Sequence, residues 1–273
     1  MLRQRVLTAI VLLILLAAVL GSASQLAFEL TLAAFFGAAC WESLRLFTVR
    51  YPLPLAAIGA AALLFFLHAG TTNSVTLAML CVLIWLLRFA PALKFGLPDA
   101  TGLRGHLFTL VYLLALLGCF MAIAALFQRS GLYLVSVMAI VWGADIGAYF
   151  SGKAFGKRKL APHISPGKSW EGAIGGWAAV LLLAGLSSQI PAFASTFAAQ
   201  LLLHFGWMIW VLLMSLLVAA SIVGDLFESL MKRRASVKDS SHLLPGHGGV
   251  LDRIDALIPV MPLAVLLGAS LGL

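Results

Sequence analysis

Long apolar segments alternate with short polar ones along almost the whole chain. Nine of them are close to the roughly 20 residues that an α-helix needs to cross a bilayer. We expect membrane-spanning helices over residues 6–22, 26–47, 53–69, 74–90, 105–127, 131–151, 171–189, 199–224 and 255–272. The pattern therefore predicts an all-α, polytopic integral membrane protein with about nine transmembrane helices.

The composition agrees with this fold class and narrows the chemistry. Of the 273 residues, 62% are hydrophobic and 10% are charged, whereas soluble domains have about 45–50% and about 25%. Cys40, Cys81 and Cys119 lie in apolar runs without CxxC spacing, which argues against a disulfide framework or a zinc site. The first apolar run follows Arg3 and Arg5 and could be a cleaved signal peptide. Because another apolar segment follows almost at once, we favour an uncleaved first helix.

The basic residues indicate how the helices are oriented. Nine spans that begin in the cytoplasm place only Arg129 of the 18 Lys and Arg residues on the outer side, in agreement with the positive-inside rule. The net charge of +8 then reflects cytoplasmic loops, and no nucleic-acid partner is needed to explain it. We expect a multi-pass protein of the inner (cytoplasmic) membrane, with a cytoplasmic N-terminus and an active site that faces the cytoplasm.

The acidic residues divide the chain into two parts. Only three of the ten acids precede residue 131. We therefore predict that transmembrane helices in residues 1–130 pack, dimerise or shape a lipid pocket. Residues 131–273 are expected to carry the chemistry, with cytoplasmic loops over residues 152–170 and 225–254.

Some carboxylates lie inside predicted membrane helices, where a charge is costly. Asp145 is one of them and is therefore a candidate functional residue. The alternative for Asp145 is a structural ion pair with a lysine such as Lys153. Glu29 and Glu42 lie in the second predicted span; they could pair with Arg45 or face a cavity, and the pattern leaves these alternatives open.

The stretch from residue 224 to residue 255 holds five of the ten acids and five of the 18 basic residues. Clustered carboxylates bind hard cations, basic residues hold phosphates, and glycines let the backbone approach an anion. The alternative is a solvated loop between membrane helices, which would rarely need so many acids. The composition favours a metal-dependent phosphoryl or nucleotidyl transfer site. Its charged residues are Asp225, Glu228, Asp239, Asp252 and Asp255, with Lys232, Arg233, Arg234, Lys238 and Arg253.

Spacing within this stretch predicts which side chains share a face. Asp225, Glu228 or Ser229, and Lys232 fall on one side of a helix. Asp252 and Asp255 are three residues apart at the start of the last predicted helix, so both carboxylates could reach one cation. His247 lies in the preceding GHGG sequence; it could bind phosphate or transfer a proton, although a lone histidine is more often a hydrogen-bonding partner.

The loop after the predicted span 131–151 is the second candidate for anion binding. Residues 152–172 contain five cations, several glycines and the pair Ser165-Pro166. Ser169 could cap the next helix, whose free N–H groups would help to hold an anion. The alternative is an ordinary positive-inside loop with Trp170 as an interface anchor, which would explain the lysines but not the glycines.

Two sequence elements resemble the signature of a known enzyme family. The longer one reads Ser229-x-x-Lys232-Arg233, then four residues, then Lys238-Asp239, and ends in Pro245-Gly246-His247-Gly248-Gly249-Val250-x-Asp252-Arg253-Ile254-Asp255. The second reads Ser165-Pro166-x-Lys168-Ser169-Trp170-Glu171-Gly172 and is preceded by Asp145-x-x-Ala148-Tyr149. Both are similar to the phosphatidate cytidylyltransferases, or CDP-diacylglycerol synthases, which are polytopic membrane enzymes of similar length.

The resemblance implies that phosphatidate attacks the α-phosphate of CTP, giving CDP-diacylglycerol and pyrophosphate. It implies Mg²⁺ as cofactor, and a second cation could lie alongside; the metal ligands would be Asp225, Asp252, Asp255 and, as a further candidate, Asp239. The first three acids, Lys232 and Arg253 would act on the reacting phosphates. The substrate-binding residues would be Asp145, Ser165, Lys168, Arg233, Lys238, His247, Gly248 and Gly249. Family likeness also suggests a homodimer.

Three other functions remain as alternatives from the sequence. A CTP-dependent lipid kinase would transfer the γ-phosphate of CTP to a membrane alcohol, and only the long signature separates it from a cytidylyltransferase. A CDP-alcohol phosphotransferase would need a DGxxAR…GxxxDxxxD arrangement, which is absent. A transporter would place its ion-binding acids near the middle of the membrane, whereas most acids here are predicted at the cytoplasmic surface.

Overall fold

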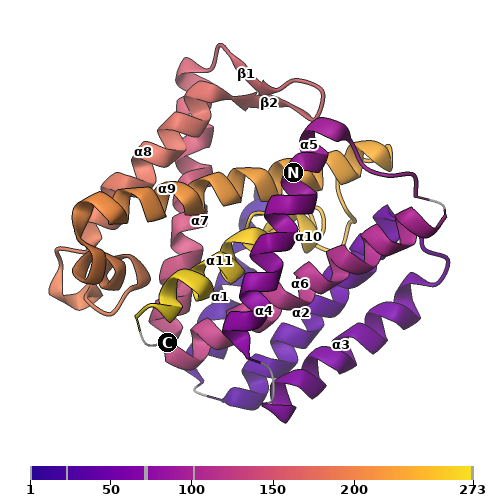
Figure 1. Cartoon of the computed structure of the whole chain (residues 1–273), viewed down its shortest axis with the longest axis horizontal. Helices are drawn as coiled ribbons and strands as arrows, with labels where there is room; N and C mark the ends of the chain where they lie inside the picture. Colours follow the sequence, from indigo (N-terminus) through magenta and orange to yellow (C-terminus); the bar gives the residue numbers. More distant parts are fainter. Residues whose placement is uncertain (1, 23, 71–72, 101, 272–273) are drawn as a thin grey trace.

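The computed structural model describes residues 2–22, 24–70, 73–100 and 102–271. Within these residues the side chains of Leu2, Arg3 and Arg5 lie outside the description. The contribution of Arg3 and Arg5 to a cytoplasmic N-terminus therefore stays a prediction. The chain is nearly all helical (Figure 1). The elements are α1 (Leu2–Gly21), α2 (Gln25–Leu46), α3 (Pro52–Ala69), α4 (Ser74–Ile84), the π-helix η1 (Trp85–Phe89), α5 (Ala90–Phe95), α6 (Leu103–Arg129), α7 (Gly131–Phe155), β1 (Lys159–Ala161), β2 (Ser165–Ser169), α8 (Trp170–Ser187), the 3-10 helix η2 (Pro191–Phe193), α9 (Phe197–Arg234), α10 (Leu251–Ile254) and α11 (Leu257–Ala269).

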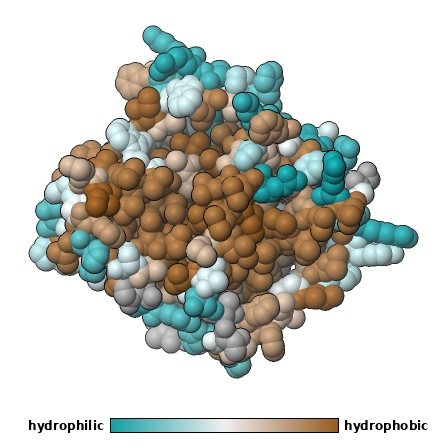
Figure 2. All heavy atoms as spheres, viewed as in Figure 1, coloured by the Kyte–Doolittle hydropathy of each residue, from teal (hydrophilic) through white to brown (hydrophobic). Residues whose placement is uncertain are grey.

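The protein is an integral membrane protein. Within the described ranges, six helical segments are long and apolar enough to cross a bilayer: α3, α4 with η1 and α5, α6, α7, α8 and α9. A broad apolar belt covers the face seen in Figure 2, and hydrophilic atoms gather toward its edges. The apolar part of α1 is shorter (Val6–Gly21), as is α11. The predicted count of nine spans and the cytoplasmic N-terminus therefore stay predictions.

One part of the fold corrects the all-α prediction. The expected loop over residues 152–170 contains an antiparallel hairpin, β1–β2, which projects at the top of Figure 1. Lys159 pairs with Ser169, and Ala161 pairs with Ser165 across an irregular register. The hairpin was not predicted because this segment lacks the alternation of apolar and polar residues that is typical of a strand. Two prolines and several lysines interrupt that pattern.

Glycines allow α7 and α8 to pack closely. A Cβ atom on Gly147 of α7 would lie 2.7 Å from the Cβ atom of Ala179 of α8. A Cβ atom on Gly176 of α8 would lie 3.2 Å from both the backbone nitrogen and the Cβ atom of Ala148 of α7. Small residues permit this approach between membrane helices, and the close packing fixes the wall from which Asp145 projects.

We expect Gly176→Ala to weaken this helix pair. The added methyl group overlaps backbone and side-chain atoms of α7, and overpacking of this kind costs about 1–3 kcal/mol. Thermal unfolding of the purified protein in detergent should show a lower midpoint. Gly143→Ala on α7 is the matched control, because its nearest new contact, with Val180, is an ordinary 3.9 Å. Equal midpoints for the two variants would contradict the proposed close packing.

An aromatic cluster fixes the end of α9 against the N-terminal half of the molecule. The Phe227 side chain is fully buried, and its ring centroid lies 4.8–6.1 Å from four other aromatic rings, those of Trp85, Phe89, Phe108 and Tyr112. These rings come from η1 and α6. The next residue on α9 is Glu228, so packing in the core determines where the acidic face of α9 lies.

Candidate active site

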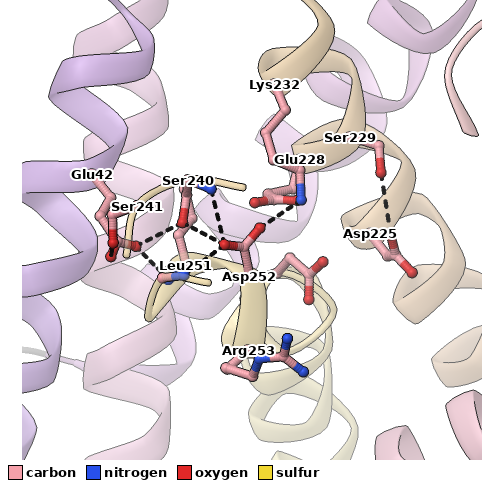
Figure 3. A network of polar contacts seen from close by, with 12 residues as sticks. Glu42, Asp225, Glu228, Ser229, Lys232, Ser240, Ser241, Leu251, Asp252 and Arg253 are labelled. Carbon is pink, nitrogen blue, oxygen red and sulfur yellow. Dashed lines mark hydrogen bonds and ion pairs between the residues drawn. The ribbon is translucent and has the colours of Figure 1, made fainter. Parts of the chain in front are cut away.

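Five carboxylates gather where α7, α9 and α10 meet. We call Asp145, Asp225, Glu228, Asp252 and Asp255 the acidic cluster. The charge of Asp225 acts on both Asp145 and Asp255, and Glu228 is influenced by Asp252 and Asp255. Figure 3 shows the part of the cluster around Asp252. Like charges close together repel one another, so the acidic cluster favours nearby cations, and Lys168 and Lys232 bind within it.

Lys232 is the cation at the centre of this network. Its ammonium group forms ion pairs with Glu228, one helical turn earlier, and with Asp252 at 2.6 Å (Figure 3). The Glu228 side chain is only 1% exposed and that of Lys232 is 13% exposed. The predicted helical face is therefore formed, but Lys232 uses it to bind Glu228 and Asp252, while Asp225 binds another partner.

Asp252 is held by hydrogen bonds on both carboxylate oxygens. Its Oδ2 atom accepts hydrogen bonds from the backbone N–H groups of Ser240 (2.9 Å) and Gly249 (2.7 Å). The Ser240 hydroxyl also lies 2.8 Å from Oδ2, and Lys232 binds Oδ1. Burial alone would raise the pKa of Asp252, but Lys232 and the Gly249 N–H outweigh it and lower the pKa to about 2. The side chain is therefore an oriented carboxylate at neutral pH.

The glycine-rich turn is shaped around this carboxylate. Gly248 has a φ of +80°, a conformation that other residues rarely adopt. A Cβ atom on Gly248 would lie 2.6 Å from Oδ2 of Asp252. Two independent reasons, backbone conformation and close approach, thus require glycine at this predicted site position.

A second ion pair joins the hairpin to α9. Lys168 of β2 pairs with Asp225, whose other oxygen is 3.5 Å from the Ser229 hydroxyl. Farther along α9, the Arg233 Nε–H donates to the carbonyl oxygen of Ile164 in the hairpin turn at 3.3 Å. The two basic loops predicted to hold anions are therefore connected through α9.

A cavity of about 390 Å³ opens between α7, α8, α9 and β2. Asp145, Asp225 and Lys168 line it together, next to apolar wall residues such as Val218 and Ile222. Its volume lies within the range of small-molecule pockets in proteins. Charged groups beside an apolar wall suit a ligand that has both a polar and an apolar part.

The base of the hairpin is fixed at the start of α8. The Ser169 hydroxyl accepts from the N–H of Gly172 at 3.1 Å, which confirms the predicted helix cap. Glu171 accepts from the backbone N–H groups of Lys157 (3.0 Å) and Arg158 (3.1 Å). These bonds hold the loop that carries Lys168 against the cavity.

Comparison with known proteins identifies the family. Residues 3–271 match the Cytidylyltransferase family. The chain belongs to this family. It is similar to a phosphatidate cytidylyltransferase of Pseudomonas aeruginosa, with 42% identity across 99% of this chain and 98% of the relative. Partial similarities include the phosphatidate cytidylyltransferases of Haemophilus influenzae (52% identity over 48% of this chain and 44% of the relative) and Bacillus subtilis (42% over 52% and 49%).

The other predicted site residues differ in whether they contact the region of the acidic cluster. Arg253 donates two hydrogen bonds to the backbone carbonyl oxygen of His247, at 3.0 and 2.7 Å, and so braces the glycine-rich turn. Ser165 begins β2. Lys238 and Asp239 are exposed, and within the described ranges neither forms an ion pair with the acidic cluster. Their proposed roles stay predictions.

The predicted metal ligands have suitable chemistry for a hard cation. Asp225, Asp252 and Asp255 supply carboxylate oxygens, which Mg²⁺ prefers. Two of these acids are neutralised by Lys168 and Lys232, and no group of three or more acidic, histidine or cysteine ligands is preformed in the part of the chain described. The residues present therefore fit a hard cation by donor type. Lys168 and Lys232 bind two of the carboxylates that would hold it.

Glu42 is a component of this region that sequence reasoning did not assign. It lies on α2, is fully buried, and accepts hydrogen bonds from the segment that carries Asp252. Neither predicted alternative is correct: Arg45 stacks over the Trp41 ring, with its Cζ atom 4.7 Å from the ring centroid. The one signal in the sequence was the cost of an acid in an apolar helix, and this signal does not reveal the partner.

Proposed function

We propose that the protein transfers the cytidylyl group of CTP to phosphatidate, producing CDP-diacylglycerol and pyrophosphate. The observation that carries this proposal is the acidic cluster with its two lysines, of which Asp145, Asp225 and Lys168 line a partly apolar cavity. Phosphate-to-phosphate chemistry brings several negative charges together, so that charge neutralisation and positioning dominate catalysis. The carboxylates of Asp145 and Asp225 and the ammonium group of Lys168 line one cavity, so groups that could bind a cation and a phosphate lie together there.

The reaction needs no strong base. An oxygen of the phosphatidate phosphate is already ionised at neutral pH and can attack the α-phosphorus of CTP. The bond from that phosphorus to the bridging oxygen breaks, and pyrophosphate leaves. Lys168 and Lys232 would hold phosphate oxygens, and Asp145 would orient a substrate from the α7 side of the cavity. His247 is then a substrate-binding residue, not a base.

We also propose Mg²⁺ as the cofactor, held by Asp225, Asp252 and Asp255, with Asp239 as a further candidate ligand and room for a second cation in the acidic cluster. When bound, Mg²⁺ would neutralise triphosphate charge. The hydrogen bonds to Oδ2 of Asp252 leave Oδ1 as the oxygen best able to exchange Lys232 for a cation. The chain's contribution is thus a set of oriented oxygens.

The site is proposed to face the cytoplasm from the inner membrane, with the N-terminus on the same side. The distribution of Lys and Arg supports this orientation. The charged hairpin and the acidic cluster would lie on the same side of the membrane, because Lys168 of the hairpin pairs with Asp225. The acyl chains of phosphatidate would lie against the apolar wall of the cavity. A homodimer formed through the N-terminal helices remains part of the proposal.

Separately labelled CTP tests the function. Purified protein in mixed micelles with phosphatidate and Mg²⁺ should move the α-phosphate label into lipid and release pyrophosphate. Movement of the γ-phosphate label into lipid, with CDP left over when a polyprenol replaces phosphatidate, would instead establish a lipid kinase. No transfer from either position in folded protein would reject both enzymes in favour of a transporter.

A further inference from the structure

The Glu42 carboxylate is saturated by donors from a distant part of the chain. Its Oε1 atom accepts from the Ser241 hydroxyl (2.5 Å) and the Val250 N–H (3.0 Å). Its Oε2 atom accepts from the Ser240 hydroxyl (3.0 Å) and the Leu251 N–H (2.6 Å). Two hydrogen bonds to each oxygen suit a carboxylate, because a carboxylate only accepts hydrogen bonds.

These four contacts hold both ends of the segment that surrounds Asp252 (Figure 3). Ser240 and Ser241 precede the glycine-rich turn, whereas Val250 and Leu251 follow it. Glu42 therefore closes the turn over residues 240–251 with one side chain. The intervening chain, residues 242–249, forms no regular helix or sheet apart from a single bridge between Leu244 and Gly248.

Ser240 connects Glu42 directly to Asp252. Its hydroxyl oxygen lies 3.0 Å from Oε2 of Glu42 and 2.8 Å from Oδ2 of Asp252. A serine hydroxyl has a single proton to donate, so the two carboxylates compete for it. A change at Glu42 therefore alters the hydrogen bonding of Asp252 as well as the position of its backbone.

The glycine-rich turn packs tightly against Glu42. A Cβ atom on Gly249 would overlap both the Ser240 hydroxyl and the Glu42 carboxylate. Glu42 is 0% exposed, so water cannot readily replace a lost partner, and an unmet hydrogen-bonding group would remain buried.

We infer that Glu42 is a positioning residue, which holds the 240–251 segment so that Asp252 keeps Oδ1, the oxygen that Lys232 binds, turned toward the proposed cation site. The inference rests on the proposed function for its catalytic part, while the structural link between α2 and the segment stands independently. The N-terminal half of the chain thereby contributes one side chain to the order of the catalytic half.

Glu42→Gln tests the inference with a nearly isosteric change. The glutamine amide would direct N–H groups at a backbone N–H or a serine hydroxyl, so two of the four hydrogen bonds are lost or reversed. Loss of an outer partner that orients a ligand typically costs about 10–100-fold in activity or metal affinity. Glu29→Gln is the matched control: it is the same change on the same helix, and Glu29 bonds Gln25 (2.7 Å), outside the acidic cluster.

Two readouts are needed. The first is cytidylyl transfer at saturating CTP, where the turnover rate should fall for Glu42→Gln and stay near wild type for Glu29→Gln. The second is hydrogen–deuterium exchange without substrates, followed by mass spectrometry, in which peptides over residues 240–255 should exchange faster in Glu42→Gln alone. A merely destabilised protein would instead exchange faster throughout the helices.

The outcomes separate the two hypotheses. An inactive wild-type protein would reject the proposed function, while the exchange data would still test the link to α2. Wild-type turnover in Glu42→Gln, or unchanged exchange over residues 240–255, would overturn the inference. If Glu42→Gln does not fold, Ser241→Ala decides, because the Ser241 hydroxyl bonds Glu42 and Asp252 accepts from Ser240 instead. The inference requires lower turnover and faster exchange over residues 240–255 in Ser241→Ala, and wild-type values of both would overturn it.

Discussion

Asp252→Asn is expected to lower the turnover rate by about 10²–10³-fold, the usual effect of removing one preorganised electrostatic group from an active site. The asparagine keeps one carbonyl oxygen, which can still accept from the Ser240 and Gly249 N–H groups. Its amide nitrogen, however, replaces the oxygen that Lys232 binds. The change therefore removes the charge and the oxygen directed at the reaction while it preserves the fold of the turn.

Steady-state assays with labelled CTP and size-exclusion chromatography check this result together. Asp99→Asn provides the same substitution at an exposed position outside the acidic cluster and should leave the rate close to wild type. Near-normal turnover in Asp252→Asn would remove Asp252 from the proposed metal ligands. Loss of monodisperse protein would show that Asp252 matters for folding, contrary to the expectation.

Much of the fold could be predicted because apolar length is a local property of the sequence. Helices occur in all the predicted spans, although the span 199–224 is interrupted at Gly206, whose φ is +72°. The Ser169 cap was visible from its position before an apolar run. The hairpin could not be predicted, because its strands are short. Contacts next to it, such as the Lys157 N–H with Glu171, join residues whose proximity the sequence does not reveal. Local pattern thus indicates helices but not the conformation of charged connections.

The candidate site shows a similar division. Helical spacing placed Asp225 and Lys232 on one face, the signature contains Lys232 and Asp252, and the structure brings all three to one region. Which acid each lysine binds was not predictable, because helical spacing allows Lys232 to reach one turn back while the fold brings Asp252 to it from another element. Glu42 was missed for the same reason: its partners lie about 200 residues away along the chain.

Lys232→Met is expected to be the most destabilising single change in the site. It removes a cation that binds both Glu228 and Asp252 in the network of Figure 3, leaving two largely buried carboxylates next to each other. Breaking a buried ion pair from one side typically costs about 3–5 kcal/mol, because the remaining charge is desolvated and uncompensated. Turnover should also be lost, since Asp252 would lose the partner that orients Oδ1.

Lys168→Met is the informative comparison, because it breaks an ion pair of the same site in a more exposed place. The Lys168 and Asp225 side chains are 26% and 29% exposed, and pairs open to solvent contribute only about 0–1 kcal/mol. Its unfolding midpoint should stay near that of the wild type, while its KM for CTP rises because Lys168 lines the cavity. Equal losses of stability in the two variants would mean that burial does not distinguish these lysines. A stability loss confined to Lys232→Met would assign Lys232 to holding the acidic cluster together and Lys168 to binding substrate.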